Sequence, residues 1–214
     1  MSTPAHKIRL VLHLRRAGIT DTRVLSAIER VPRELFVPEA FQDRAFDDTA
    51  LPIGHGQTLS QPLVVARMTE ALQVGERMKV LEVGTGSGYH AAVLALLCRR
   101  LYTIERLAAL KKLAEQRFAQ LNLRNVTTLA GDGCLGWTQQ APFDRICVTA
   151  AAAEPPPALV EQLAVGGSMV MPLGARGRKQ TLVRYHRTSD RVQIEKLGQV
   201  RFVPLVESEE GVVR

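Results

Sequence analysis

The sequence MKVLEVGTGSGY (residues 78–89) decides the fold of this chain. A mostly apolar run comes first, three glycines separated by small polar residues follow, and the apolar segment YHAAVLALLC (89–98) comes next. Together these segments predict a strand, a tight turn and a helix. Gly84, Gly86 and Gly88 let the backbone turn sharply and approach a ligand closely, while the start of the helix presents unpaired N–H groups.

Further apolar runs alternate with helical patterns after this unit. Strand-like runs occur at 101–104, 126–129, 145–148 and 168–173, and helical patterns occur at 107–121 and 158–163. Strands that alternate with helices predict βαβ units around a parallel sheet. The last runs, 181–185, 192–197 and 200–206, have no helix between them and predict an antiparallel edge. We therefore expect a doubly wound, mostly parallel α/β core over residues 76–214.

Residues 1–75 are expected to form a helical cap on this core. The segment 21–31 places Val24, Leu25, Ile28 and Val31 on one helical face, with Thr20 or Asp21 as the N-cap and Pro32 as the stop. The polar, glycine-containing segment 51–61 predicts a loop. Pro62 then opens a second helix, so this loop ends at a helix N-terminus near Ser60.

Length and composition indicate a globular protein. With 214 residues, one α/β domain plus a substantial extra segment is expected. The 46% hydrophobic and 23% charged residues are close to globular averages. No apolar stretch approaches the roughly 18 residues of a membrane span, and the N-terminus MSTPAHKIRL carries charge where a signal peptide is apolar. We expect a cytoplasmic protein without membrane association.

Charge and cysteine content exclude other classes of partner. The formal net charge of +7 comes from scattered Lys and Arg, and aromatic residues for base stacking total only 5%, so we expect no nucleic-acid partner. Cys98, Cys134 and Cys147 show no CxxC spacing and are expected to be reduced core thiols. The five histidines show no metal-ligand spacing, and no metal is expected.

The glycine turn and the ends of the next strands suggest a cofactor site. A dinucleotide fingerprint needs a sixth-position glycine where this chain has Tyr89, whereas E/D-x-G-x-G-x-G resembles the first motif of S-adenosylmethionine-dependent methyltransferases. Glu82 would hold the ammonium end of that cofactor directly or through the turn. Glu105, 21 residues after Gly84, is placed to bind the ribose diol. Asp132 would accept from the adenine amino group, and Gly133 leaves room for the ring.

Two kinds of nucleic-acid methyltransferase are disfavoured by the remaining loops. The amino-methylating enzymes of DNA commonly carry N/D-P-P-aromatic after the fourth strand, whereas this chain reads CVTAAAAEPPP (147–157) with no aromatic residue following. Cytosine C5 enzymes use a cysteine that typically follows proline, and none of the three cysteines here does.

Motifs along nearly the whole chain resemble the protein-L-isoaspartate O-methyltransferase family. They are PRELF (32–36), ALPIGHGQTLSQP (50–62), VLEVGTGSGY (80–89), GDG (131–133), PFDRICVTAAA (142–152), LAVGGSMVMPLG (163–174) and RFVPLV (201–206). The resemblance implies a Rossmann-like methyltransferase fold. It also implies S-adenosyl-L-methionine as cofactor and methylation of the free carboxylate of L-isoaspartyl residues in proteins and peptides.

The resemblance also implies roles for residues of this chain. It implies that Ser60, in the T-x-S-x-P active-site loop (54–62), is the catalytic residue and lies between cofactor and substrate. The predicted cofactor-binding residues are Thr58, Leu59, Ser60, Glu82, Gly84, Thr85, Gly86, Gly88, Tyr89, Glu105, Asp132 and Gly133. Val203, Pro204 and Leu205 join Ser60 as substrate-binding residues. Many family members carry His or Tyr where this chain has Leu63.

Other readings remain open at the level of sequence. The acceptor carboxylate could belong to a small molecule or a peptide natural product, or the chain could be a cofactor-binding module that has lost catalysis. The intact Ser60 loop argues against the second reading. We expect a monomer, whose peptide substrates bind largely through their backbone because damaged sites occur in many sequences.

Overall fold

The glycine turn joins strand β3 (Lys79–Val83) to helix α4 (Tyr89–Ala95), as the sequence predicts. The computed structural model describes residues 4–175 and 178–206. All seven residues of α4 are buried. Small residues such as Ala91 and Ala92 let this helix pack closely beneath the sheet, so the turn before it is held at a fixed place.

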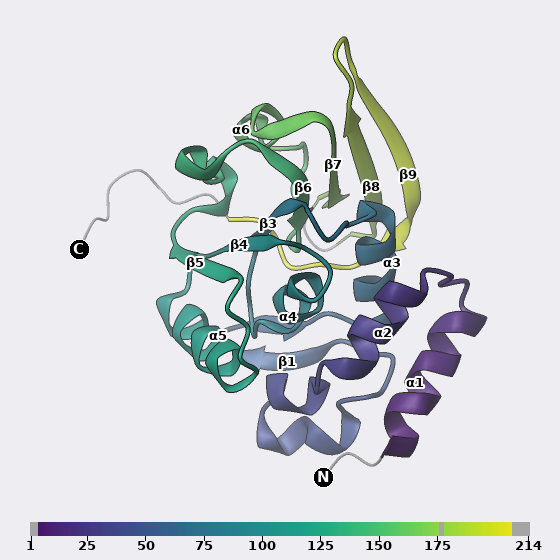
Figure 1. Cartoon of the computed structure of the whole chain (residues 1–214). Helices are drawn as coiled ribbons and strands as arrows, with labels where there is room; N and C mark the ends of the chain where they lie inside the picture. The colour runs from purple at the N-terminus through teal and green to yellow at the C-terminus, as the bar shows by residue number, and fades with distance from the viewer. Residues whose placement is uncertain (1–3, 176–177, 207–214) are drawn as a thin grey trace.

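Seven strands form one sheet in the order β5-β4-β3-β6-β7-β8-β9. The other strands are β4 (Arg100–Glu105), β5 (Val126–Ala130), β6 (Phe143–Val148), β7 (Leu163–Leu173), β8 (Gln180–Arg187) and β9 (Val192–Val200). Strands β3 to β7 pair in parallel, while β8 is antiparallel to both its neighbours. The predicted doubly wound, mostly parallel sheet with an antiparallel edge is confirmed (Figure 1).

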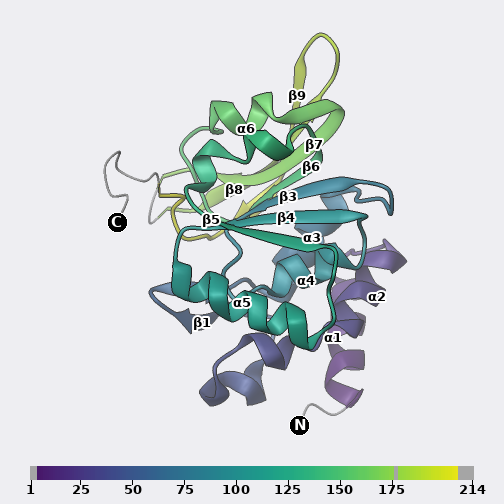
Figure 2. The ribbon, with the colours of Figure 1, turned by 60° about the vertical axis from the view of Figure 1, so that its left-hand side comes forward.

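Helices cover both faces of this sheet. Figure 2 shows α3 (Pro62–Leu72), α4 and α5 (Ala108–Gln120) on one face and α6 (Pro157–Glu161) on the other. Successive side chains of a strand point to opposite faces of the sheet. Val80 therefore packs with the first set of helices and Leu81 with the second. The predicted helix at 158–163 is shorter in the structure, because Leu163 already begins β7.

The N-terminal segment packs beside α3, α4 and α5. It contains α1 (Pro4–Arg16), α2 (Thr22–Arg30) and two short 3-10 helices, η1 (Arg33–Phe36) and η2 (Glu39–Arg44). Asp21 caps α2, as predicted, by accepting from the Arg23 N–H. Buried residues of this segment and of the sheet belong to one hydrophobic cluster. The N-terminal segment and the sheet therefore pack as one body. The boundary between cap and core at residues 75 and 76 stays a prediction.

Two sequence predictions are wrong in detail. The predicted loop at 51–61 contains a small antiparallel hairpin, β1 (Leu51–Gly54) with β2 (Gln57–Leu59), whose turn residues His55 and Gly56 both have positive φ. The predicted strand at 200–206 does not form as such. Val200 ends β9, and only Pro204 makes an isolated bridge.

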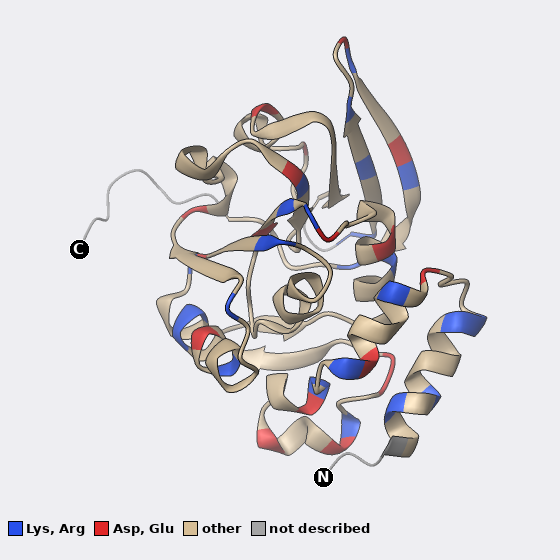
Figure 3. Cartoon of the chain, in the orientation of Figure 1, with Lys and Arg blue, Asp and Glu red and all other residues tan. Residues whose placement is uncertain are grey.

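The cysteines lie in the interior, and the charged residues of both signs lie mixed along the chain. Cys98, Cys134 and Cys147 are free and buried, which confirms them as core thiols. Figure 3 shows Lys and Arg interspersed with Asp and Glu over helices and strands. Within residues 4–175 and 178–206, no helix combines the length and apolar character needed to cross a bilayer.

Candidate functional site

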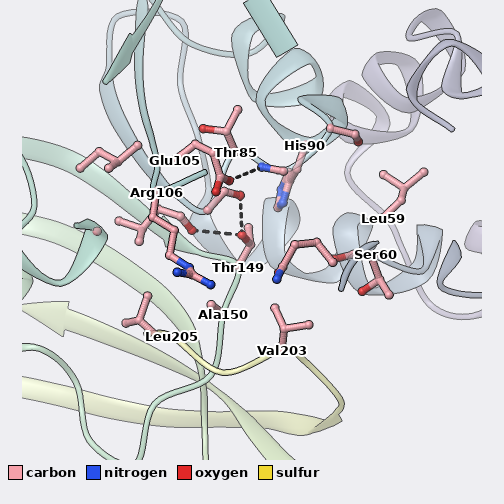
Figure 4. Close-up of a pocket in the computed structure, with 18 of the residues that line it drawn as sticks. Leu59, Ser60, Thr85, His90, Glu105, Arg106, Thr149, Ala150, Val203 and Leu205 are labelled. Carbon is pink, nitrogen blue, oxygen red and sulfur yellow. Dashed lines mark hydrogen bonds between the residues drawn. The ribbon is translucent and has the colours of Figure 1, made fainter. Parts of the chain in front are cut away.

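A cavity of about 90 Å³ lies at the carboxyl ends of β3, β4 and β6. The chain leaves β3 toward β4 on one side, while β6 lies on the other, so the cavity sits where the strand order reverses. Ligands of open α/β sheets bind at this kind of switch point. In Figure 4, Glu105 and Arg106 lie on one side of the cavity, Leu59 and Ser60 on the other, and Val203 and Leu205 along the bottom.

The glycine turn shapes the cavity through its backbone. Gly84 and Gly86 have φ of 93° and 54°, a region that favours glycine. A Cβ on Gly84 would collide with the Thr149 hydroxyl, which donates to the Gly84 carbonyl at 2.6 Å. Gly133 shows a similar constraint, because a Cβ there would collide with Val83. Both glycines keep the loops after β3, β5 and β6 close together.

Glu105, the last residue of β4, holds the turn from the side. One carboxylate oxygen accepts from the Gly86 N–H at 2.8 Å, and the other accepts from the Leu107 N–H at 3.0 Å. The residue is 7% exposed and lines the cavity. Each oxygen keeps a second lone pair, so a diol reaching this carboxylate would find two acceptors already oriented by backbone bonds.

Ser60 lies across the cavity from Glu105 and is fixed through its backbone. Its carbonyl accepts from Nη2 of Arg33 at 2.7 Å. Arg33 is fully buried, also donates from Nε to the Ala45 carbonyl at 2.8 Å, and stacks on the Tyr89 ring at 4.6 Å. The Ser60 hydroxyl makes no hydrogen bond with any part of the chain that the structure describes. It is therefore available to a ligand in the cavity.

The start of α3 is capped by Asp48, not by Ser60. The N-cap position belongs to Gln61, whose side chain makes no capping bond. Asp48 instead accepts from the Leu63 N–H and from the Gln61 amide, both at 2.9 Å, and pairs with His13 at 2.9 Å. Ser60 therefore does not cap this helix. A carboxylate of the chain itself already occupies the positive end of this helix.

Glu82 faces the sheet interior instead of the cavity. It is fully buried and pairs across the sheet with Thr103 on β4 and Cys147 on β6. The Thr103 hydroxyl donates to Glu82 at 2.6 Å and lies 2.6 Å from the Thr85 hydroxyl. Glu82 thus reaches the glycine turn only through two hydroxyl groups, which is the indirect version of its predicted role.

Burial raises the pKa of Glu82 to about 8, the Thr103 hydrogen bond opposes the rise, and the charge of Glu105 adds to it. A carboxyl group whose folded pKa lies above its unfolded value stabilises the fold below the unfolded pKa of about 4.5, and that stabilisation is lost as pH rises through the folded pKa. We expect Glu82→Gln to remove a loss of stability on the order of a few kcal/mol that otherwise occurs between about pH 4.5 and pH 8. Melting temperatures across this range measure the effect.

The matched control for Glu82→Gln is Glu39→Gln. Glu39 is exposed, and its replacement makes the same Glu-to-Gln change outside the buried row. Its melting curves should keep the pH slope of the unmodified protein. Parallel slopes for Glu82→Gln and the unmodified protein would show that Glu82 does not titrate in this range.

A second buried polar row lies beneath the cavity. The Thr69 hydroxyl donates to the Val65 carbonyl at 2.8 Å, so its oxygen accepts from Nε2–H of His90 at 2.9 Å. Nδ1 of His90 then faces the Cys147 thiol at 3.9 Å. Burial lowers the pKa of His90 to about 3, which keeps the imidazole neutral at pH 7. The row adds no charge to the cavity wall.

The segment 201–206 forms the lower wall of the cavity. The Ala151 N–H donates to the Val203 carbonyl at 2.8 Å, and the Leu205 N–H donates to the Ala151 carbonyl at 2.7 Å. The buried Gln180 amide pairs with the backbone of Phe202, accepting from its N–H at 2.7 Å. These bonds explain why 201–206 is extended without being a strand of the sheet.

Most residues predicted for the site line this cavity. They are Thr58, Leu59, Ser60, Gly84, Thr85, Gly86, Tyr89, Glu105, Gly133, Val203, Pro204 and Leu205. Their individual roles stay predictions. Three predicted residues do not line the cavity: Glu82 faces the sheet interior, Gly88 packs against Phe118, and Asp132 accepts from the Cys134 N–H at 2.7 Å to cap a 3-10 helix.

Sequence reasoning missed the rest of the lining. These residues are Gln57, Val65, Val83, Ser87, His90, Ile104, Arg106, Thr149, Ala150 and Val206. Several of them are sequence neighbours of predicted residues. Thr149 and Ala150 follow β6 at the carboxyl edge of the sheet, so their position at a strand end could have identified them. Across residues 4–175 and 178–206, no three His, Cys, Asp or Glu side chains come together as a metal site.

Comparisons with known proteins agree over nearly the whole chain. Residues 5–210 match the model of the protein-L-isoaspartate(D-aspartate) O-methyltransferase family. A protein-L-isoaspartate O-methyltransferase of Paramagnetospirillum magneticum is 62% identical over 201 residues, which cover 94% of each chain. A solved protein-L-isoaspartate O-methyltransferase superposes with a TM-score of 0.85 at 26% identity, covering 92% of this chain and 65% of that one.

A Plasmodium falciparum protein of the same name was solved with S-adenosyl-L-homocysteine. It superposes with a TM-score of 0.82 at 25% identity, covering 95% of this chain and 99% of the other. The similarity thus includes both the sheet with its cavity and the N-terminal segment.

Proposed function

The chain belongs to the protein-L-isoaspartate(D-aspartate) O-methyltransferase family, and we propose that the cavity between Ser60 and Glu105 is its active site. The activity is transfer of a methyl group from S-adenosyl-L-methionine to the free carboxylate of L-isoaspartyl residues in damaged proteins and peptides. One observation carries the assignment of the site: a single cavity joins the glycine turn, the carboxylate of Glu105 and the unengaged hydroxyl of Ser60.

The residues of the cavity fit the cofactor. Positive φ at Gly84 and Gly86 creates a backbone cradle, and Glu105 offers two oriented acceptors for a diol. Gly133 lines the cavity at the adenine position expected after β5, and a Cβ there would collide with Val83. When bound, S-adenosyl-L-methionine supplies a methyl group on a sulfonium. Arg106 adds a cation to the wall beside Glu105.

Ser60 is assigned the role of orienting the acceptor carboxylate. An α-carboxylate has a reference pKa of roughly 3.3 to 3.7, so it is ionised at pH 7 and needs no general base. The hydroxyl of Ser60 donates one hydrogen bond to a carboxylate oxygen and holds it in line with the reacting methyl carbon. Arg33 fixes the Ser60 carbonyl, and Val203 and Leu205 help exclude water from the charged nucleophile.

A pair of matched peptides tests the function. One peptide contains isoaspartate and the other aspartate at the same position, and both are incubated with methyl-labelled cofactor. We expect a base-labile methyl ester on the isoaspartyl peptide only. Equal labelling of both peptides, or cofactor binding without labelling of either, would contradict the repair activity. A panel of small carboxylic acids in the same assay tests the alternative that the methyl acceptor is a small molecule.

Replacing Glu105 should weaken cofactor binding. Hydrogen bonds to a charged group contribute roughly 1.5 to 3 kcal/mol, so Glu105→Ala should raise the dissociation constant by about ten- to a hundredfold. Glu105→Gln keeps one acceptor oxygen for the turn and should give a smaller loss. Calorimetry on folded variants measures both. Unchanged affinity in Glu105→Ala would remove Glu105 from the site.

We further propose that the protein acts as a monomer in the cytoplasm. Glu105 and Ser60, to which the proposal gives cofactor and acceptor roles, both belong to this chain, so a monomer carries both groups. The three free buried thiols fit a reducing compartment. Sedimentation and cell fractionation test the two parts of this proposal separately.

A further inference from the structure

A second cavity of about 370 Å³ opens beside the first and shares Ser60 with it. Thr58, Thr149 and Val203 also belong to both cavities. Its volume falls in the range of roughly 300 to 1,000 Å³ that is usual for ligand pockets. A chain whose carboxylate reaches Ser60 would therefore have room for its neighbouring residue here.

Two cations lie at the far wall of this second cavity. Gln180 on β8 pairs with Val200 on β9, so Lys179 and Arg201 occupy the next opposed positions just beyond the paired strands. Both are exposed. Like charges opposed at a strand end destabilise the free protein, so this pair of cations favours an anion between them.

No charge on the chain compensates this pair in the described residues. Neither Lys179 nor Arg201 makes an ion pair or side-chain hydrogen bond there, and none of the residues lining the second cavity is acidic. Two of the other polar side chains in this cavity are already engaged. Gln61 donates to Asp48, and Gln199 donates to Thr181. Val64, Val200 and Phe202 add apolar side chains to the lining.

We propose that this cavity is a subsite for an acidic residue that flanks the isoaspartyl residue, and that Lys179 and Arg201 set this preference. The proposal rests on the proposed function, because it places the acceptor carboxylate at Ser60. A flanking Glu or Asp side chain would contact these apolar residues and present its carboxylate to both cations. The preference should appear in substrate binding and leave the chemical step unchanged, since neither cation lines the first cavity.

A peptide series of equal length measures the preference. Isoaspartyl peptides carry Glu, Ala or Lys on the amino side of the isoaspartate in one set and on the carboxyl side in another. At low ionic strength we expect a KM for one Glu-flanked peptide on the order of three- to tenfold below that of its Ala counterpart, with equal kcat. Near 1 M salt, where screening acts over about 3 Å, the difference should shrink.

Variants locate the preference. The double variant K179Q/R201Q should bind all flanking residues alike, and K179E/R201E should prefer Lys. The control R99Q/K112Q removes the same charge from two exposed residues, one just before β4 and one on α5. Both lie outside the second cavity, so this control should keep the preference for Glu.

The outcomes separate the two proposals. No labelling of the Ala-flanked peptide by the unmodified enzyme would overturn the proposed function itself. Normal labelling with no effect of flanking charge overturns only the subsite. Loss of the preference in the control variant would also overturn it, because the long-range field of the protein would then be the cause.

Discussion

Ser60→Ala should lose turnover by on the order of a hundredfold while keeping its stability. The hydroxyl makes no hydrogen bond in the described structure, so its removal leaves no protein group unpaired. It lies where the acceptor carboxylate must be aligned, and a misplacement near 1 Å can reduce the rate a hundredfold. Single-turnover assays should show the loss, with a melting temperature close to that of the unmodified protein and nearly unchanged cofactor affinity.

Asp48→Ala is the matched control for this prediction. Asp48 is the true cap of α3, and losing a cap costs about 0.5 to 2 kcal/mol. This variant should therefore melt at a lower temperature, whereas Ser60→Ala should not. Near-normal turnover in Ser60→Ala, or a drop in its stability equal to that of Asp48→Ala, would contradict the assignment of Ser60 to the reaction.

The parts of the fold that sequence predicts well have local causes. The strand, turn and helix around Gly84 are encoded by neighbouring residues, and apolar periodicity places the later strands within a few positions. The hairpin at 51–59 was missed because its strands are only four and three residues long. The turn residues His55 and Gly56 adopt positive φ without the Asn-Gly or Asp-Gly pair that usually signals a hairpin turn.

The parts that sequence does not predict depend on distant partners. The segment 201–206 is apolar like a strand, but Gln180 and Ala151 take its backbone hydrogen bonds. Asp48 reaches the start of α3 from 15 positions away, and Arg33 reaches the Ser60 carbonyl from 27 positions away. The apolar periodicity of the sequence does not predict such contacts, because they form only when the N-terminal segment packs against the rest of the chain.

Glu82 shows that the glycine motif does not by itself fix where a side chain points. It lies between Leu81 and Val83, so its side chain points to the opposite face of the strand. That face is buried too, because helices cover both sides of the sheet. The motif marks where the chain turns, but the strand decides where the carboxyl points. Gly88 is similar, because the third glycine of the turn avoids Phe118 of α5 and does not line the cavity.

Arg33→Met should cost both stability and turnover. The substitution keeps an unbranched side chain but removes the donors to the Ala45 and Ser60 carbonyls. Leaving the two acceptors unpaired costs about 1 to 3 kcal/mol each, about 2 to 6 kcal/mol together, which lowers the melting temperature by roughly 4 to 24 °C. In the surviving folded protein, Ser60 loses its anchor. We therefore expect kcat to fall by on the order of tenfold or more, with a smaller change in KM.

Two further variants separate positioning from general stability. Arg33→Lys keeps the charge but cannot span two carbonyls, so it should recover only part of the lost kcat. Arg145 is a matched control, since it donates to the Leu72 carbonyl from β6 without lining the cavity. Arg145→Met should lower the melting temperature and leave kcat intact. If Arg33→Met also keeps its kcat, the buried guanidinium stabilises the fold without positioning Ser60, and the catalytic geometry must come from α3 and its Asp48 cap.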